Sequence, residues 1–282
     1  MQAPSFVVAG TQKAATTWLY ECVNEHPQGH VSPIKELHYF CNPTHCDKSR
    51  AGKGLEWYLS QFEAASQCLV RGEFSIDYMF YPEIAAKLHD LNPEMKILFI
   101  LRDPADRAHS AYWMHRRNHV DYPPLSEFIR RDDDIVSRGL YHDQIQNFRT
   151  HFSDDQILIL IYEDIAKDPF AFVSKVFAFL GVDPEFRPKS ASQLIAETKH
   201  LNPLLSKVLY RYAVRILRFP PALWTWRMVK GLTGIKARAA GSQQKSKYPD
   251  MSESDRSRLA DIFEDENNKL YELIGRRITE WQ

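Results

Sequence analysis

Apolar runs alternate with amphipathic segments along the first 180 residues of the chain. A short, continuous apolar run bounded by polar residues predicts a strand of a parallel sheet, because helices cover such a strand on both faces. We expect strands of this kind at 6–9, 69–73, 97–101 and 157–162. Helical spacing between the runs predicts helices that begin at Thr16, Pro82 and Pro104, and further helices over 141–152 and 169–180. The alternation predicts a three-layer α/β fold, with a central parallel sheet flanked by helices.

A loop that contains a lysine follows the first predicted strand. Residues 10–17 read Gly-Thr-Gln-Lys-Ala-Ala-Thr-Thr and precede a predicted helix. Backbone N–H groups at a helix start attract anions, and Lys13 with the threonine hydroxyls adds a cation and further donors. The nucleoside-triphosphate loop G-x-x-x-x-G-K-[ST] does not fit, because Ala14 and Ala15 stand where glycine and lysine are required. The segment therefore predicts a phosphate site of another kind, and the alternative is an ordinary strand-to-helix turn.

A second group of polar residues follows the predicted strand 97–101. Arg102 comes directly after that strand, and Asp103 with the proline after it is typical of a helix start. Ser110 lies two turns along this helix. Ligands of open α/β sheets bind beyond the carboxyl ends of the strands, so we expect both segments to contact one anionic ligand. The alternative is that Arg102 forms an ion pair with Asp103 or Asp106.

Together these segments resemble the sulfotransferase family that uses 3′-phosphoadenosine 5′-phosphosulfate (PAPS) as donor. In that family the loop with the lysine binds the 5′-phosphosulfate, and an R-[DN]-P-x-x-R-x-x-S-x-[YF] segment binds the 3′-phosphate. The second pattern is matched here by Arg102, Asp103, Pro104, Arg107, Ser110 and Tyr112. The loop differs from the Y-P-K-[SA]-G-[TN]-[TS]-W of cytosolic members and is more similar to the branch of bacterial and heparan-sulfate enzymes. The resemblance implies a P-loop-like fold and a donor site formed by Gln12, Lys13, Ala14, Ala15, Thr16, Thr17, Arg102, Ser110, Tyr162, Lys245, Ser246, Lys247 and Tyr248.

The resemblance extends over nearly the whole chain. Residues 32–40 are similar to the K-E-x-[HQ]-[FY]-F element of that branch, whose glutamate is taken to be the catalytic base. Residues 159–164 and 179–182 resemble a late strand and an F-L-G turn, and 245–251 resembles the loop that closes over the donor. The end of the chain, 270–281, is similar to the tail of bacterial members.

This resemblance implies in-line transfer of a sulfuryl group from PAPS to an acceptor hydroxyl or amine, with adenosine 3′,5′-bisphosphate as product. It implies Glu36 as the base and Lys13 as the cation that stabilises the leaving phosphate. His38 is the alternative base, because in an extended segment Glu36 and His38 point to the same side. A nucleotide-dependent kinase would need a standard loop and magnesium ligands, and the sequence shows neither. A binding protein without activity is the third class considered.

The sequence departs from the heparan-type pattern at two positions. Cys41 stands where several of those enzymes have an aspartate, and Phe74, in the element 73–78, stands where they have a lysine. An apolar side chain near the acceptor would suit a less anionic substrate.

Two histidines and two cysteines lie close together in the sequence. His38, Cys41, His45 and Cys46 are candidate metal ligands, but zinc sites usually have paired short spacings separated by a longer loop. The resemblance also implies that sulfuryl transfer needs no metal, so we expect none. We expect the other two cysteines, Cys22 and Cys68, in the core.

Length and composition indicate a single domain over 1–282. Four cysteines give no disulfide framework, and neither a signal segment nor an apolar run of membrane-spanning length is found, so we expect a cytoplasmic protein. Lysine with arginine and aspartate with glutamate both number 36, which gives no net charge to attract nucleic acid.

The stretch 200–240 combines helical apolar spacing with basic residues. We expect a C-terminal helical region that forms a lid or an acceptor-side element, with a core element or a membrane-surface contact through 204–230 as alternatives. We expect 241–251 to close over the donor. A small molecule, a glycan, a lipid or a polyketide all suit the predicted chemistry as acceptor. The sequence distinguishes neither these acceptors, nor O- from N-sulfation, nor the oligomeric state.

Overall fold

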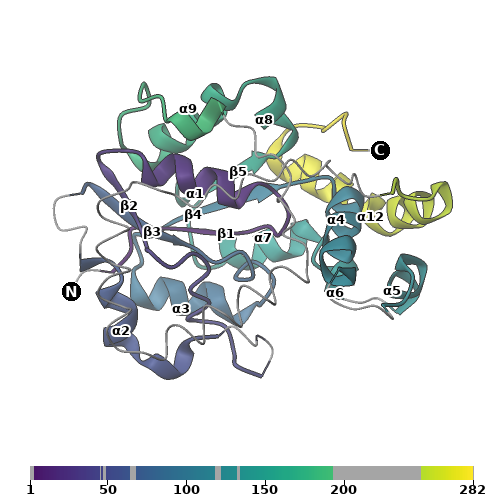
Figure 1. The fold of residues 1–282 in the computed structure, drawn as a ribbon, viewed down its shortest axis with the longest axis horizontal. Coiled ribbons are helices and arrows are strands. Elements are labelled where there is room, and N and C mark those ends of the chain that lie inside the picture. The colour runs from purple at the N-terminus through teal and green to yellow at the C-terminus, as the bar shows by residue number, and fades with distance from the viewer. Residues whose placement is uncertain are drawn as a thin grey trace, which may run out of the picture. The chain divides into compact units, whose positions relative to one another are not determined.

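The computed structural model describes residues 3–44, 46, 49–63, 68–117, 122–131, 134–192 and 249–281. All of these belong to one compact unit. At its centre is a five-stranded, all-parallel sheet with the order β2-β3-β1-β4-β5 (Figure 1). The strands are β1 (Phe6–Gly10), β2 (Gly29–Val31), β3 (Val70–Phe74), β4 (Lys96–Leu101) and β5 (Ile157–Ile161). The four predicted strands are confirmed, and the short strand β2 is added at one edge of the sheet.

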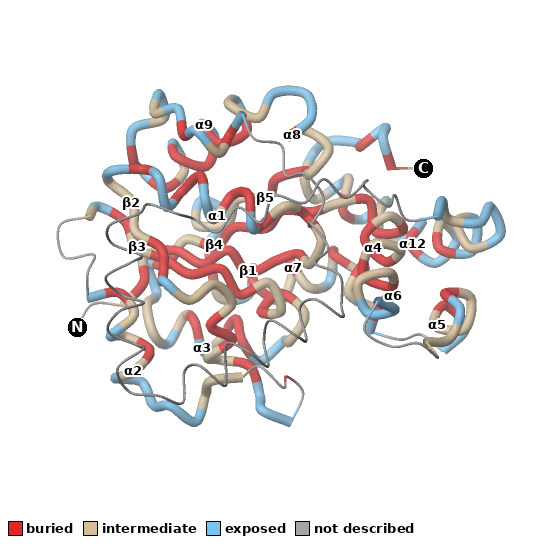
Figure 2. The backbone as a smooth tube through the Cα atoms, in the orientation of Figure 1, coloured by how far each residue is buried: buried red, intermediate tan, exposed pale blue. Residues whose placement is uncertain are grey.

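Helices cover both faces of the sheet, as the continuous apolar strands predict (Figures 1 and 2). One face packs against α1 (Thr16–Asn24), α8 (Glu163–Lys167) and α9 (Pro169–Leu180). The other packs against α3 (Glu83–Leu91), α7 (Tyr141–Arg149) and the end of α12 (Glu253–Ile274). Along β1 the side chains alternate, with Phe6 and Val8 in the first core and Val7 and Ala9 in the second. The predicted three-layer α/β fold is therefore confirmed.

A third apolar cluster joins α12 to the helices that follow β4. These helices are α4 (Pro104–Arg116), α5 (Leu125–Arg131) and α6 (Asp134–Ser137). The remaining elements are α2 (Leu55–Ser60) and the 3₁₀ helices η1 (Ala51–Lys53), η3 (Asp154–Gln156) and η4 (Lys189–Ser192). Ser252 caps α12 by accepting a hydrogen bond from the Asp255 N–H at 3.1 Å. The helix then brings the C-terminal residues back to the sheet.

Several sequence-based expectations concern residues outside the described part of the chain. These are the helical region 200–240 with its alternatives through 204–230, and the donor residues Lys245, Ser246, Lys247 and Tyr248. Of the predicted donor-closing loop, only 249–251 is described. Within the described ranges, none of the helices is both long enough and apolar enough to cross a bilayer. Cys22 is buried in the core as expected, whereas Cys68 is only half-buried.

Candidate functional site

The predicted anion-binding segments lie at the carboxyl edge of the sheet, where its strand order reverses. From β1 the chain builds β2 and β3 on one side and β4 and β5 on the other. The loop with Lys13 follows β1, and Arg102 follows the adjacent strand β4. Such a reversal leaves a crevice between neighbouring loops, which is where open α/β sheets bind ligands. The sheet topology therefore brings the two segments together.

The Lys13 loop turns sharply into α1. Lys13 and Ala15 have φ values of 70° and 57°, in the left-handed region, and α1 begins at the next residue without a side-chain cap. The loop is fixed to β4 by the Thr11 N–H, which donates to the carbonyl oxygen of Ile100 at 3.0 Å. Because no side chain caps the first turn, its N–H groups point toward whatever occupies the crevice.

The predicted donor residues of this loop differ in their exposure. Ala14 and Thr16 are buried, Gln12, Lys13 and Ala15 are half-buried, and Thr17 is exposed. The buried members fix the backbone of the loop, and the Lys13 side chain retains access to the crevice.

Arg102 connects the two predicted anion sites directly. Its Nη1 donates a hydrogen bond to the carbonyl oxygen of Lys13 at 3.1 Å, and its guanidinium lies 4.9 Å from the centre of the Tyr162 ring. Tyr141 donates its hydroxyl to the Arg102 carbonyl oxygen at 2.9 Å. Tyr162, at the end of β5, therefore adjoins the same site as Lys13 and Arg102.

The alternative ion pairs of Arg102 are not formed. Asp103 caps α4 by accepting a hydrogen bond from the Asp106 N–H at 2.7 Å, as the Asp-Pro signal predicts. The Asp106 carboxylate forms its ion pair with Arg256 at 2.7 Å. In the described part of the chain, neither Lys13 nor Arg102 forms an ion pair with a carboxylate. Within the described ranges, Lys13 and Arg102 therefore carry positive charge that no ion pair neutralises.

The pKa of Lys13 reflects this charge. Burial lowers the pKa of its ammonium, and the neighbouring guanidinium groups of Arg117 and Arg102 lower it further. Like charges held close together in a partly buried site favour the binding of a multivalent anion, which relieves their repulsion. Arg117 was not among the predicted site residues. Its position just past the end of α4 is the only feature of the sequence that could have identified it as part of the site.

Ser110 and Arg107, two further members of the 3′-phosphate motif, lie on α4. Ser110 is half-buried, two turns beyond Arg102. Arg107 is completely buried, donates to the carbonyl oxygen of Ile135, and has its pKa lowered to about 10 by burial. Arg107 therefore joins α4 to α6, and its side chain does not reach the crevice.

Glu36 lies at the same edge, beyond the end of β3. Its N–H donates to the carbonyl oxygen of Phe74, the last residue of β3, at 2.9 Å, and the N–H of His38 donates to the Ser75 hydroxyl at 3.0 Å. Since β3 adjoins β1, this segment is one strand away from the Lys13 loop. Glu36 and His38 have φ values of 61° and 48°, so the extended conformation considered for this segment is wrong. The tight turn nevertheless brings the two side chains together, with Glu36 Oε2 3.6 Å from His38 Nε2.

Glu36 and His38 differ in exposure and in charge environment. The Glu36 side chain is 26% exposed, whereas that of His38 is 0% exposed. The His38 imidazole, together with Lys35 Nζ at 2.7 Å from Oε1, holds the pKa of Glu36 at about 2. Glu36 is therefore an ionised carboxylate that solvent reaches, and His38 lies behind it.

Two acidic residues behind His38 were not predicted from the sequence. The Asp77 carboxylate lies 3.6 Å from His38 Nδ1 and forms an ion pair with Arg138 at 2.7 Å. Glu73 is fully buried and accepts hydrogen bonds from Tyr58 at 2.9 Å and from Ser75 at 3.1 Å. Burial raises the pKa of Glu73 to about 7. Asp77 and Glu73 lie in a segment whose motif was recognised, but only the fold shows that they surround His38.

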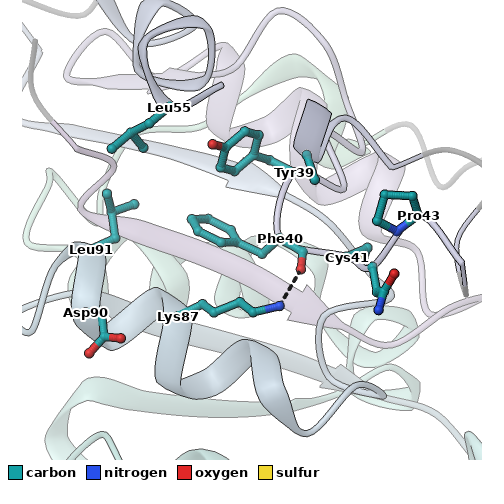
Figure 3. Close-up of a pocket in the computed structure, with 10 residues that line it drawn as sticks. Tyr39, Phe40, Cys41, Pro43, Leu55, Lys87, Asp90 and Leu91 are labelled. Atoms are coloured by element: carbon teal, nitrogen blue, oxygen red, sulfur yellow. Dashed lines mark hydrogen bonds between the residues drawn. The ribbon is translucent and has the colours of Figure 1, made fainter. Parts of the chain in front are cut away.

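The two departures from the heparan-type pattern are both buried. Phe74 packs in the core between Phe6 and Tyr20, so the expectation that its ring shapes the acceptor site is wrong. Cys41 is fully buried and adjoins a pocket of about 650 Å³ (Figure 3). Lys87 of α3 donates to the carbonyl oxygen of Phe40 beside this pocket at 3.3 Å. The residues that line the pocket are Tyr39, Phe40, Cys41, Asn42, Pro43, Ala51, Leu55, Lys87, Asp90 and Leu91. None of the predicted donor residues is among them.

Known proteins with similar sequences are sulfotransferases. Bifunctional heparan sulfate N-deacetylase/N-sulfotransferase 4 of Mus musculus is 27% identical over 302 residues, which are 99% of this chain and 31% of that protein. Bifunctional heparan sulfate N-deacetylase/N-sulfotransferase 2 of Homo sapiens is 26% identical over 303 residues, which are 97% of this chain and 30% of that protein. The chain thus spans about three tenths of the length of these curated relatives.

Solved structures show the same fold. A sulfotransferase from Alicyclobacillus acidocaldarius superposes with a TM-score of 0.71 at 23% identity, over 100% of this chain and 99% of that one. The sulfotransferase domain of the Synechococcus PCC 7002 olefin synthase gives a TM-score of 0.53 at 17% identity, over 93% of this chain and 95% of that one.

A family model described as the sulfotransferase domain matches residues 3–210, a stretch that includes both anion-binding segments and Glu36. The match lends no support to the kinase alternative. Because it extends over well more than half of the 282 residues, the chain belongs to the sulfotransferase domain family.

Proposed function

We propose that the protein transfers a sulfuryl group from PAPS to a hydroxyl or amine of an acceptor. The observation that carries the proposal is the hydrogen bond of 3.1 Å between Arg102 Nη1 and the Lys13 carbonyl oxygen. It joins two anion-binding segments, 89 residues apart in sequence, at the crevice of the sheet. PAPS bears phosphate groups at both ends of its ribose and therefore needs two neighbouring anion sites.

The residues of the crevice suit this donor. The uncapped start of α1 and the Lys13 ammonium would hold the 5′-phosphosulfate, and Arg102 with Ser110 would hold the 3′-phosphate. The donor supplies the sulfuryl group and an anionic leaving group. Lys13 stabilises the charge that develops on the departing phosphate, and its partial burial strengthens that interaction.

Glu36 is the proposed base. Its exposed carboxylate can contact an acceptor, whereas the fully buried His38 ring cannot, and this contrast favours Glu36 over the alternative base. Lys35 and His38 keep Glu36 ionised and orient its oxygens. A carboxylate of low pKa is a weak base, so an acceptor that displaces Lys35 from Oε1 would increase its basicity. His38 then acts by positioning Glu36.

Acceptor and location belong to the same proposal. The curated relatives are named for heparan sulfate, which makes the amine or hydroxyl of a glycan the first acceptor to test. Small molecules, lipids and polyketides are tested beside it. A cytoplasmic location, which the sequence favours, is checked by cell fractionation, and membrane contact through 204–230 by vesicle flotation.

Two measurements test the proposal. Adenosine 3′,5′-bisphosphate should bind in the absence of magnesium, and more tightly than adenosine 5′-phosphate, because only the former contacts the Arg102 site. Labelled PAPS incubated with a glycan, lipid and small-molecule panel should yield a sulfated product identified by mass. Tight binding of adenosine triphosphate that requires magnesium, without sulfate transfer to any acceptor, would contradict the proposal.

A further inference from the structure

The segment just beyond Glu36 folds back and gathers three metal-binding side chains. The Cys41 N–H donates to the His38 carbonyl oxygen at 3.3 Å, and the Cys46 N–H donates to that of Asn42 at 3.0 Å. These turns bring ligand atoms of His38, Cys41 and Cys46 to within 4.8 Å of one another. All three residues are buried. We propose that they bind a thiophilic divalent cation of the zinc class.

The separations match the dimensions of a zinc site. Zinc–sulfur bonds of about 2.3 Å and zinc–nitrogen bonds of about 2.0 Å at tetrahedral angles place the two ligand atoms roughly 3.5 Å apart. His38 Nδ1 lies 3.9 Å from Cys41 Sγ, so this pair needs a few tenths of an ångström of movement to hold a metal, and Cys46 must approach them from within the 4.8 Å that bounds the cluster. The spacings His-x₂-Cys and Cys-x₄-Cys are short, as in zinc-binding turns.

The surroundings of His38 also favour a cation. The Asp77 carboxylate lies 3.6 Å from the same Nδ1 atom and is held by Arg138, which gives the site a nearby anion. On the other side of the ring, Nε2 is buried and makes no standard hydrogen bond within the described residues. A metal on Nδ1 would fix the proton on Nε2, which faces Glu36 Oε2 at 3.6 Å. The cation would thereby set the tautomer of the ring that positions Glu36.

The proposed cation would have a structural role and would not take part in sulfuryl transfer. It would fix the turns that carry Cys41 and Cys46, and Cys41 forms part of the wall of the pocket in Figure 3. The inference therefore stands or falls separately from the proposed function, and its test measures metal instead of turnover.

The test uses the full chain, expressed with zinc in the medium and purified without chelators. Mass spectrometry of the metal content should find about one zinc per chain. The variants Cys41→Ser and Cys46→Ser should each lose most of it, because serine is a poor zinc ligand. Cys22→Ala is the matched control, since Cys22 is equally buried but lies outside the cluster and should keep the metal. Cobalt substituted for zinc in the unmodified chain should show thiolate charge-transfer absorption, a readout that does not depend on the folding of a variant.

Three outcomes would overturn the inference. The first is a content below about 0.1 zinc ions per chain after zinc loading, with Cys41 and Cys46 both reacting as free thiols. The second is a disulfide between Cys41 and Cys46, found by peptide mass mapping of protein extracted from cells with a reducing interior. The third is metal that survives both serine substitutions, which would place it elsewhere, for example at His142, Asp143 and Glu266.

Discussion

At the scale of single residues, the site depends on which charges are left without a protein partner. Asp103 is used as a helix cap and Asp106 pairs with Arg256, so among the described residues Arg102 forms no ion pair with a carboxylate, and its guanidinium contacts the Lys13 carbonyl oxygen and the Tyr162 ring. Glu36 is the reverse case, a carboxylate held ionised by Lys35 and His38. A positive site and a negative one therefore lie at the same edge of the sheet, which is the charge pattern needed for an anionic donor and a base.

Replacing Arg102 by lysine tests whether the guanidinium recognises phosphate by its shape. Arg102→Lys keeps the charge but loses the planar fork that can donate two parallel hydrogen bonds. We expect about a tenfold weaker affinity for adenosine 3′,5′-bisphosphate, measured by isothermal titration calorimetry. Arg130→Lys, on the exposed surface of α5, is the control. Equal affinities of the two variants would show that the guanidinium fork of Arg102 does not contribute to nucleotide binding.

Glu36→Gln separates catalysis from binding. The amide keeps the size of the carboxylate but cannot accept a proton, and only one of its two terminal atoms can accept a hydrogen bond from Lys35 or His38. We expect kcat to fall about 100-fold or more, while the Kd for adenosine 3′,5′-bisphosphate is unchanged. His38→Gln should change kcat less if His38 only positions Glu36. A variant at Glu36 that retains full turnover would exclude this residue as the base.

At the scale of elements, β3 supplies close backbone packing and the buried carboxylate behind the site. An added Cβ at Gly72 would lie 2.4 Å from the carbonyl oxygen of Phe6 on β1, and backbone cannot move away as a flexible side chain can. The next residue, Glu73, is buried under Tyr58 and Ser75. The strand that fixes Glu36 through the Phe74 carbonyl oxygen therefore tolerates little change in volume or charge.

Gly72→Ala should destabilise the protein through this clash. We expect a loss of about 1 to 3 kcal/mol in the free energy of unfolding, measured by urea denaturation. Gly52→Ala is the matched control, because nothing lies within 4 Å of a Cβ added there. Comparable stability of the two variants would mean that β1 and β3 are not packed as closely as described.

The Glu73 carboxyl group should make stability depend on pH. Its pKa is about 7 in the folded protein against an ordinary 4.5, so between these values the unfolded chain releases the proton while the folded one retains it. Stability should therefore fall as pH rises from 4.5 to 7, by at most about 3.5 kcal/mol at 1.4 kcal/mol per unit. Glu73→Gln should remove this slope in urea denaturation at pH 5 and pH 7.5, and Glu83→Gln, at an exposed position, should keep it. An unchanged slope in Glu73→Gln would assign the pH dependence to another group.

At the scale of the whole described unit, the C-terminal residues stabilise the edge that carries the site. The Trp281 indole N–H donates to Glu163 Oε2 at 3.1 Å, and Glu163 Oε1 accepts from the Asp103 N–H at 3.1 Å. Arg276 forms a two-pronged ion pair with Asp164 at 2.8 and 2.9 Å. The tail thus contacts the start of α8, and Glu163 connects it to the start of α4, next to Arg102 and Tyr162 in the sequence.

Trp281→Ala should therefore destabilise the protein although the residue lies next to the chain end. Loss of a buried indole and its hydrogen bond should cost about 3 to 5 kcal/mol in the free energy of unfolding, again by urea denaturation. Ile262→Ala, at a position of α12 that is 38% exposed, is the control and should change stability little. A loss below about 0.5 kcal/mol at Trp281 would show that the tail is not packed on the sheet in solution.

The sequence by itself determined four of the five strands, the starts of the main helices that flank them, and the family. Continuous apolar runs have to be buried on both faces, and Asp-Pro and lysine-loop signals act on neighbouring residues, so they can be recognised without the fold. The tertiary structure alone decided that Arg102 contacts the Lys13 carbonyl, that Arg107 and Phe74 are buried away from the site, and that Glu36 is partly exposed while His38 is buried. It also decided that Asp77, Glu73 and Arg117 belong to the site. Contacts of this kind join residues that are distant in sequence or depend on which way a turn points, and no local pattern of hydrophobic and polar positions encodes either.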